Sequence, residues 1–265
     1  MSNQKEFIYD NARVQIHGSV AALGIAAAQD AAQLINQVIT DNGHARIMVA
    51  TGNSQIAFID ALTKQSIDWK AVEVFHMDEY SGISETHPAS FRQWIKTRLE
   101  NKVNPRQMHY IRGDASDLNG EIQRYSTLLE AAPVDVAFVG FGENGHIAFN
   151  DPPNADFNDP LNVKRVQLDE PCRRQQAGEG HFRDLAAVPL EAITVTCPGL
   201  FRARAWVSCV PEARKAKAVQ SALEGPISTA CPASLIRRHP NATLYLDTES
   251  AGLLSASNAA GSSAS

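Results

Sequence analysis

Two adjacent acids stand in the segment HMDEY, residues 76–80, directly after the apolar run at residues 72–75. A carboxylate at the end of a buried strand can face a ligand cleft, where it can move a proton on a carbon next to a carbonyl. Asp78 and Glu79 are therefore candidate general bases. An acidic surface loop is the alternative interpretation of this pair, and His76 is expected to be structural or exposed.

The segment GFGENGHIAFND, residues 140–151, places His146 directly after three closely spaced glycines. Glycines in such a pattern indicate a sharp turn or a backbone that approaches a ligand. Asn144 and Asp151 could orient the imidazole, and an oriented histidine exchanges protons near neutral pH. A structural histidine is the alternative. The glycines also fit the GxGxxG spacing of dinucleotide sites, but no compelling acidic partner for a ribose accompanies them.

A third polar segment, TGNS at residues 51–54, separates the apolar run at 46–50 from a helical pattern at 55–65. A glycine turn before a helix offers unpaired backbone N–H groups, and the neighbouring hydroxyls add donors, so the segment suits a phosphate. Ser54 could instead simply cap the helix. The cations of RKAK, residues 214–217, either are solvated or include one that reaches a phosphate.

The sequence predicts neither a metal centre nor a disulfide framework. His76, Asp78, His146 and Asp151 could in principle form a metal site, but their spacing matches no metal-ligand pattern. The four cysteines form no CxxC pair and share no such spacing with a histidine. We therefore expect buried free thiols in a reducing compartment, and catalysis without a metal.

Composition excludes several classes of partner. The formal net charge of the 265 residues is −5, so we expect no general attraction to nucleic acid or to an anionic membrane. The sequence contains no run of eighteen apolar residues, so it predicts no membrane span. Residues 1–10 are charged and lack the apolar core of a signal peptide, which favours a cytoplasmic location.

The elements that must position these segments alternate between strand and helix. This order is typical of an α/β, Rossmann-like fold with a mostly parallel sheet and helices on both faces, in which ligands bind beyond the carboxyl ends of strands. We expect a single domain over residues 1–254 and a disordered Ser/Ala/Gly-rich tail over 255–265. The expected strands are residues 46–50, 72–75, 134–139, 192–196, 205–209 and 243–246, and the expected helices are residues 20–42, 55–65, 91–99, 119–131 and 213–224.

Two of these segments, HMDEY at 76–80 and GHIAFN at 145–150, resemble the motifs of the glucosamine-6-phosphate deaminases. The resemblance extends from about residue 50 to residue 247. It includes the HP pair at 87–88 with its following helix, and Lys215 ahead of LEG at 223–225. The wider superfamily also contains 6-phosphogluconolactonases, which share the sheet and the glycine turn but usually lack these sequences at the two motifs.

The resemblance implies an enzyme that converts glucosamine 6-phosphate and water into fructose 6-phosphate and ammonium, without a cofactor. Asp78 would take the C2 proton and return one at C1, and His146 would assist ring opening. Asn144 and Asp151 would support that histidine. The implied substrate-binding residues are Thr51, Gly52, Asn53, Ser54, Gly145 and Lys215.

Three departures from the family pattern accompany the resemblance. Asp151 stands where a glutamate is usual, the phosphate turn reads GNS instead of GGT, and residues 172–180 do not clearly preserve a family arginine. The alternatives are a sugar-phosphate lactonase, in which His146 would activate water, and a non-catalytic sugar-phosphate sensor. The expected ligand is a phosphorylated amino sugar, and the chain could form a homo-oligomer.

Overall fold

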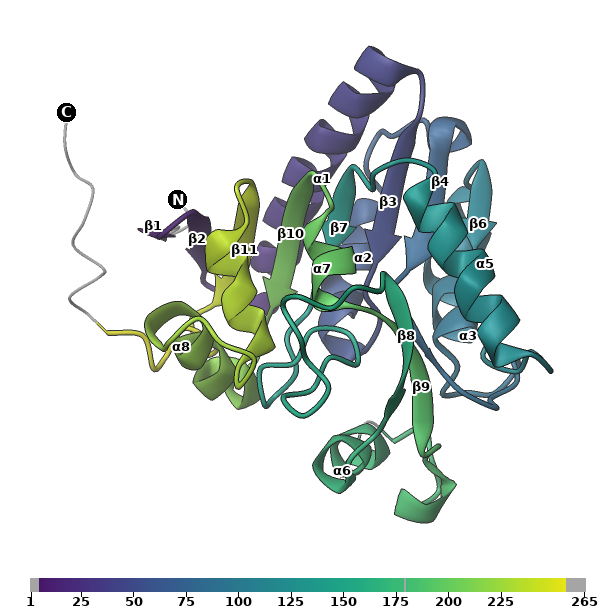
Figure 1. Cartoon of the computed structure of the whole chain (residues 1–265). Helices are drawn as coiled ribbons and strands as arrows, with labels where there is room; N and C mark the ends of the chain where they lie inside the picture. Colours follow the sequence, from purple (N-terminus) through teal and green to yellow (C-terminus); the bar gives the residue numbers. More distant parts are fainter. Residues whose placement is uncertain (1–4, 179, 256–265) are drawn as a thin grey trace.

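A large eight-stranded sheet forms the centre of the computed structural model, which describes residues 5–178 and 180–255 (Figure 1). The strands lie in the order β1-β2-β11-β10-β7-β3-β4-β6, and every neighbouring pair except β1–β2 runs parallel. The expected mostly parallel α/β fold is therefore confirmed. Of the expected tail, residues 256–265 lie outside the described residues. The strands are β1 (Lys5–Tyr9), β2 (Ala12–His17), β3 (Ala45–Val49), β4 (Val72–His76), β6 (Gln107–His109), β7 (Val136–Phe138), β10 (Ala205–Val210) and β11 (Ala242–Asp247).

Helices cover both faces of this sheet, as expected. Side chains alternate along each strand, so Ile47 and Val49 of β3 pack in one apolar cluster with α1 and α2, while Met48 packs in the opposite cluster with α5, α7 and α8. None of the described helices is long and apolar enough to cross a membrane. The helices are α1 (Val20–Asn42), α2 (Ile56–Leu62), α3 (Phe91–Ile95) with a π-helical continuation (Lys96–Glu100), α4 (Asn101–Val103), α5 (Leu118–Glu130), α6 (Glu170–Gly178), α7 (Cys197–Phe201) and α8 (Ala216–Glu224).

A second, three-stranded antiparallel sheet projects from the carboxyl ends of the large sheet together with α6 (Figure 1). Its strands are β5 (Asp78–Tyr80), β9 (Glu191–Val195) and β8 (Val163–Gln167), in that order across the sheet. The strand expected at 192–196 therefore belongs to this small sheet. A separate apolar cluster, which includes Tyr80 and Phe182, fills the space between the small sheet and α6.

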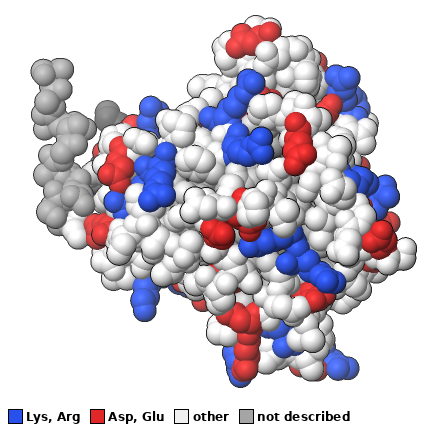
Figure 2. Space-filling view, viewed as in Figure 1, with Lys and Arg blue, Asp and Glu red and all other residues white. Residues whose placement is uncertain are grey.

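Acidic and basic side chains are interspersed over the face of the molecule seen in Figure 2. This mixture agrees with the modest net charge of −5. An anionic substrate must therefore be recognised by local donors, because no broad single-sign field covers this face.

Candidate active site

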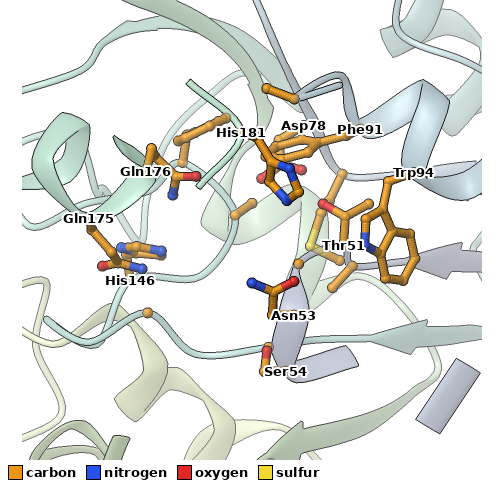
Figure 3. A pocket seen from close by; sticks show the side chains of 18 of the residues that line it. Thr51, Asn53, Ser54, Asp78, Phe91, Trp94, His146, Gln175, Gln176 and His181 are labelled. Carbon is orange, nitrogen blue, oxygen red and sulfur yellow. The ribbon is translucent and has the colours of Figure 1, made fainter. Parts of the chain in front are cut away.

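One pocket lies where the carboxyl ends of β3, β4 and β7 meet the small sheet and α6 (Figure 3). Parallel neighbouring strands end at the same edge of a sheet, so segments far apart in the sequence converge here. The pocket brings together residues from all three polar segments and from the start of α8. The predicted site residues that line it are Thr51, Gly52, Asn53, Ser54, Asp78, His146 and Lys215.

Asp78 is the buried carboxylate of this pocket. It begins β5, and only 7% of the residue is exposed. Burial, followed by the negative charges of Glu79 and Asp151, raises the pKa of Asp78 well above its usual value. A carboxylate with a raised pKa is a stronger proton acceptor once it is ionised, so Asp78 is suited to remove a proton from carbon.

Glu79 points away from this chemistry and anchors α3. Its carboxylate accepts hydrogen bonds from the backbone N–H groups of Tyr80, Phe91 and Arg92 and from the Ser90 hydroxyl, at 2.7–3.1 Å. A carboxylate at a helix start satisfies N–H groups that have no partner within the helix. Both adjacent acids are therefore buried, which excludes the acidic surface loop, and of the two only Asp78 lines the pocket.

His146 is held from behind by two polar side chains. Its Nδ1 lies 2.9 Å from Asp151 Oδ1, and the same carboxylate oxygen accepts a hydrogen bond of 2.9 Å from Asn144 Nδ2. Asn144 Oδ1 in turn accepts from the His146 backbone N–H at 3.0 Å. Burial opposes ionisation of Asp151, but its contacts with His146 and Asn144 lower the pKa of Asp151 below the usual value. The imidazole therefore faces the pocket with Nε2 while an ionised carboxylate fixes Nδ1.

The glycines around His146 leave space for this arrangement. A Cβ on Gly142 would lie 2.2–2.3 Å from three atoms of the His146 ring, so the ring occupies the place of a side chain. Gly145 has φ +83°, and a Cβ there would meet Cys231 Sγ at 2.6 Å. Asn144, Gly145 and Asp151 lie outside the pocket lining, so Asn144 and Asp151 reach the pocket through His146 and the requirement at Gly145 is one of packing.

The predicted phosphate segment forms one wall of the pocket. Gly52 has φ +101°, a conformation that favours glycine, and the turn is tied down by Gln55 Nε2, which donates to Ser54 Oγ at 3.1 Å and to the Cys209 carbonyl at 3.0 Å. Ser54 makes no side-chain cap for the following helix, so the capping alternative does not hold. Lys215 lines the same pocket and is only 3% exposed, so the alternative of a solvated lysine does not hold.

Sequence reasoning missed the wall that α6 and α3 contribute. The pocket is lined by Gln175 and Gln176 of α6, by His181 after it and by Trp94 of α3 (Figure 3). Phe182 also lines it. The one indication in the sequence is the polar segment at 172–180, where two glutamines precede two glycines. This pattern matches no known motif, so it does not predict a binding site.

His76 is structural. Its Nε2 accepts a hydrogen bond of 2.7 Å from the Ile111 backbone N–H. Burial, followed by the charges of Arg92 and Arg124, lowers the pKa of His76 to about 3. Within residues 5–178 and 180–255, no three His, Cys, Asp or Glu side chains come together as a metal site.

Comparisons with known proteins agree with this geometry. The family model described as glucosamine-6-phosphate isomerases/6-phosphogluconolactonase matches residues 18–245. Glucosamine-6-phosphate deaminases of Bacillus thuringiensis (strain Al Hakam) and Bacillus cereus (strain AH820) are each 34% identical to this chain over 223 residues, or 84% of this chain and 83% of theirs. A solved monomeric glucosamine-6-phosphate deaminase matches with a TM-score of 0.82 at 26% identity, over 91% of this chain and 99% of that chain. The 6-phosphogluconolactonase of Shewanella baltica OS155 shares the fold, with a TM-score of 0.74 at 17% identity over 91% and 99% of the two chains.

Proposed function

The chain belongs to the family of glucosamine-6-phosphate isomerases and 6-phosphogluconolactonases, and we propose that it converts glucosamine 6-phosphate and water into fructose 6-phosphate and ammonium. The observation that carries this proposal is the convergence of Asp78 and His146 on one pocket. A buried base and an oriented histidine are the two groups that this reaction needs. The relatives at 34% identity carry the name of this deaminase, whereas the lactonase of Shewanella baltica is 17% identical.

The phosphate is the remote anchor of the substrate. The segment 51–54 supplies hydroxyl and backbone donors on one wall, and Lys215 supplies a buried cation in the same pocket. Binding at the phosphate orients the sugar without touching the reacting carbons, so it contributes to positioning in the ground state and in the transition state alike.

His146 opens the sugar ring. Its Nε2 moves a proton between the anomeric hydroxyl and the ring oxygen, which breaks the bond from C1 to the ring oxygen and leaves an aldehyde at C1. Asp151 stabilises the imidazolium that forms in this step, because its carboxylate lies 2.9 Å from Nδ1. Asn144 holds that carboxylate in place at 2.9 Å.

Asp78 then moves a proton from C2 to C1. Removal of the C2 proton, with a proton passing from the ammonium group of the substrate to O1, gives a neutral enolamine with a hydroxyl at C1. Return of the proton from Asp78 to C1 then gives a protonated imine at C2. Water adds to the C2 imine, and the C–N bond breaks with the electron pair leaving on nitrogen. Ammonium and the keto group of fructose 6-phosphate are the products, and no electron acceptor is required.

An assay for ammonium tests the proposal directly. The purified chain should release ammonium from glucosamine 6-phosphate and should not hydrolyse 6-phosphogluconolactone. Hydrolysis of the lactone without ammonium release would identify the lactonase instead. Tight binding of the amino-sugar phosphate without either product would identify the non-catalytic sensor.

We also place the reaction in the cytoplasm, with the phosphorylated amino sugar as the small-molecule partner. All four cysteines are free and buried, which supports a reducing compartment. A homo-oligomer stays a prediction, and light scattering on the purified chain measures it. Fractionation of cells that produce the protein tests the location.

A further inference from the structure

A hydrogen bond joins the small sheet to α6 at the edge of the pocket. The Tyr80 hydroxyl donates to Gln176 Oε1 at 2.6 Å. Tyr80 is 1% exposed, and its ring packs against the rings of Phe91, Phe149 and Phe182 at centroid distances of 5.0–5.3 Å. The tyrosine is thus a rigid donor that fixes one end of a partly exposed glutamine.

The other end of the Gln176 amide is a donor. The tyrosine fixes Oε1 as an acceptor, so the Nε2 group supplies the two donors of the amide. Both Tyr80 and Gln176 line the pocket. Figure 3 shows Gln176 reaching from α6 toward the space between Asp78 and His146, on the opposite side of the pocket from Ser54.

We propose that Gln176 is a substrate-contact residue, whose Nε2 donates to an oxygen on the half of the sugar that carries the reacting carbons, and that Tyr80 is its positioning residue. The inference rests on the proposed function, because it assigns the sugar end and the phosphate end of the same substrate. A neutral amide suits a hydroxyl or carbonyl oxygen, while the doubly charged phosphate lies with Lys215.

The chemistry of such a contact gives it a role in specificity. A site built to donate to a hydroxyl loses a hydrogen bond when that hydroxyl is absent or points elsewhere. Gln176 therefore contributes to the choice among amino-sugar phosphates. The phosphate contacts do not, since every member of that substrate class carries the phosphate.

The first experiment compares Gln176→Leu and Gln176→Glu with wild type. Both remove the Nε2 donor, but Glu keeps an acceptor for the Tyr80 hydroxyl. We expect kcat/KM for glucosamine 6-phosphate to fall about 5- to 10-fold in both variants. Inhibition by inorganic phosphate should be unchanged in both, whereas Lys215→Ala should weaken it. Arg174→Ala on the same helix is the control, because Arg174 and its partner Glu170 are 67% and 60% exposed.

The second experiment is a double-mutant cycle with Tyr80→Phe. If Tyr80 acts through Gln176, the phenylalanine should raise KM about 3-fold in the wild-type background and have no further effect in Gln176→Leu. Equal effects in the two backgrounds would overturn the positioning role. Wild-type kinetics of Gln176→Glu would overturn the substrate contact, because the Tyr80 bond alone would then account for the residue.

Calorimetry separates this inference from the proposed function. Glucosamine 6-phosphate and inorganic phosphate are titrated into each variant, whether or not ammonium is released. A loss of affinity in Gln176→Leu for the sugar phosphate alone supports the contact even if the chain proves to be a sensor. Equal losses for both ligands, or no binding of the sugar phosphate by a folded wild type, would overturn it.

Discussion

At the scale of the residue, Asp78 combines burial with two neighbouring negative charges, Glu79 and Asp151. Asp78→Asn keeps the shape of the side chain and removes the base. We expect kcat to fall by about 10²-fold or more while KM changes little, because the phosphate contacts are retained. Steady-state kinetics of ammonium release measures both constants. A kcat near that of wild type would remove Asp78 from the mechanism.

The same residue makes stability depend on pH. The pKa of Asp78 is raised in the folded state, so the unfolded chain releases this proton at a lower pH than the folded chain does. Above the unfolded pKa, near 3.9, the folded state therefore holds more protons, and stability is lost as pH rises toward the folded pKa. Asp78→Asn should remove this loss. Thermal unfolding should show a higher Tm for the variant than for wild type at pH 7, and a smaller difference between the two Tm values near pH 3. The same difference at both pH values would contradict the burial of the charge.

His146 and Asp151 act as one unit if the carboxylate works through the imidazole. His146→Gln and Asp151→Asn should then each lower kcat, and the double variant should be little worse than the worse single variant. His146→Gln should also lose less activity in the reverse direction, from fructose 6-phosphate and high ammonium, because acyclic ketose enters after the ring-opening step. Kinetics in both directions for the three variants measures this. Additive losses, equal in both directions, would leave Asp151 as a structural residue of the turn.

At the scale of the element, the glycine turn after β7 sets the position of His146. Gly142→Ala puts a methyl group 2.2–2.3 Å from the ring, so the imidazole must move away from Asp151. We expect kcat to fall by about 10-fold or more, since small displacements of catalytic groups are costly. Gly18→Ala is the matched control, because a Cβ at Gly18 meets nothing within 4 Å. Comparable kinetics for the two variants would show that the turn adapts.

The elements that the sequence predicts well are those with long, regular patterns. The helix expected at 20–42 is α1 with the same ends, because Ser19 accepts from the Ala22 N–H and Gly43 ends the helix with φ +79°. The parallel strands read as short apolar runs because both of their faces are buried. The strand expected at 72–75 is β4, one residue longer.

The small sheet and the α6 wall could not be predicted in the same way. β5 has three residues, too few to show a period, and its partner β9 begins more than a hundred positions later. The segment of α6 is mostly polar, and glutamines such as those in it are equally common on exposed helices that line no site. Gln176 stands out only through its hydrogen bond with the Tyr80 hydroxyl, and these two residues are 96 positions apart in the sequence. Sequence motifs therefore predicted Asp78 and His146 as site residues, whereas pocket residues outside any motif, such as Gln176, can be identified only from contacts in the folded structure.

At the scale of the whole molecule, the order of strands assembles the site. β3 lies between β4 and β7, so the phosphate segment after β3 stands between Asp78, which follows β4, and His146, which follows β7. Successive segments, 51–54, 76–80 and 140–151, lie about 20 and about 60 residues apart in the sequence and meet because their strands are parallel neighbours. The sheet thus sets the distances that the chemistry needs, and the helices behind it hold those strand ends in place.

The phosphate segment depends on how α1 packs against α2. α2 follows the segment 51–54 directly, and Gly24 of α1 lies so close to it that a Cβ would meet the carbonyl carbon and oxygen of Ala57 at 2.8 Å. Backbone atoms cannot rotate away as a side chain can, so Gly24→Ala must push the two helices apart. We expect a loss of about 1–3 kcal/mol in stability, which exceeds the roughly 1 kcal/mol that alanine gains over glycine within a helix.

The displacement of α2 should also reach the substrate, since the phosphate donors move with the start of that helix. Gly24→Ala should therefore lower Tm and raise KM several-fold, with kcat little changed because Asp78 and His146 follow other strands, β4 and β7. Ile25→Ala is the control on the same helix, because Ile25 is 51% exposed. Thermal unfolding and ammonium-release kinetics measure both effects. A lower Tm with an unchanged KM would show that the phosphate segment is held by its own contacts, from Gln55 to Cys209, and not by α1.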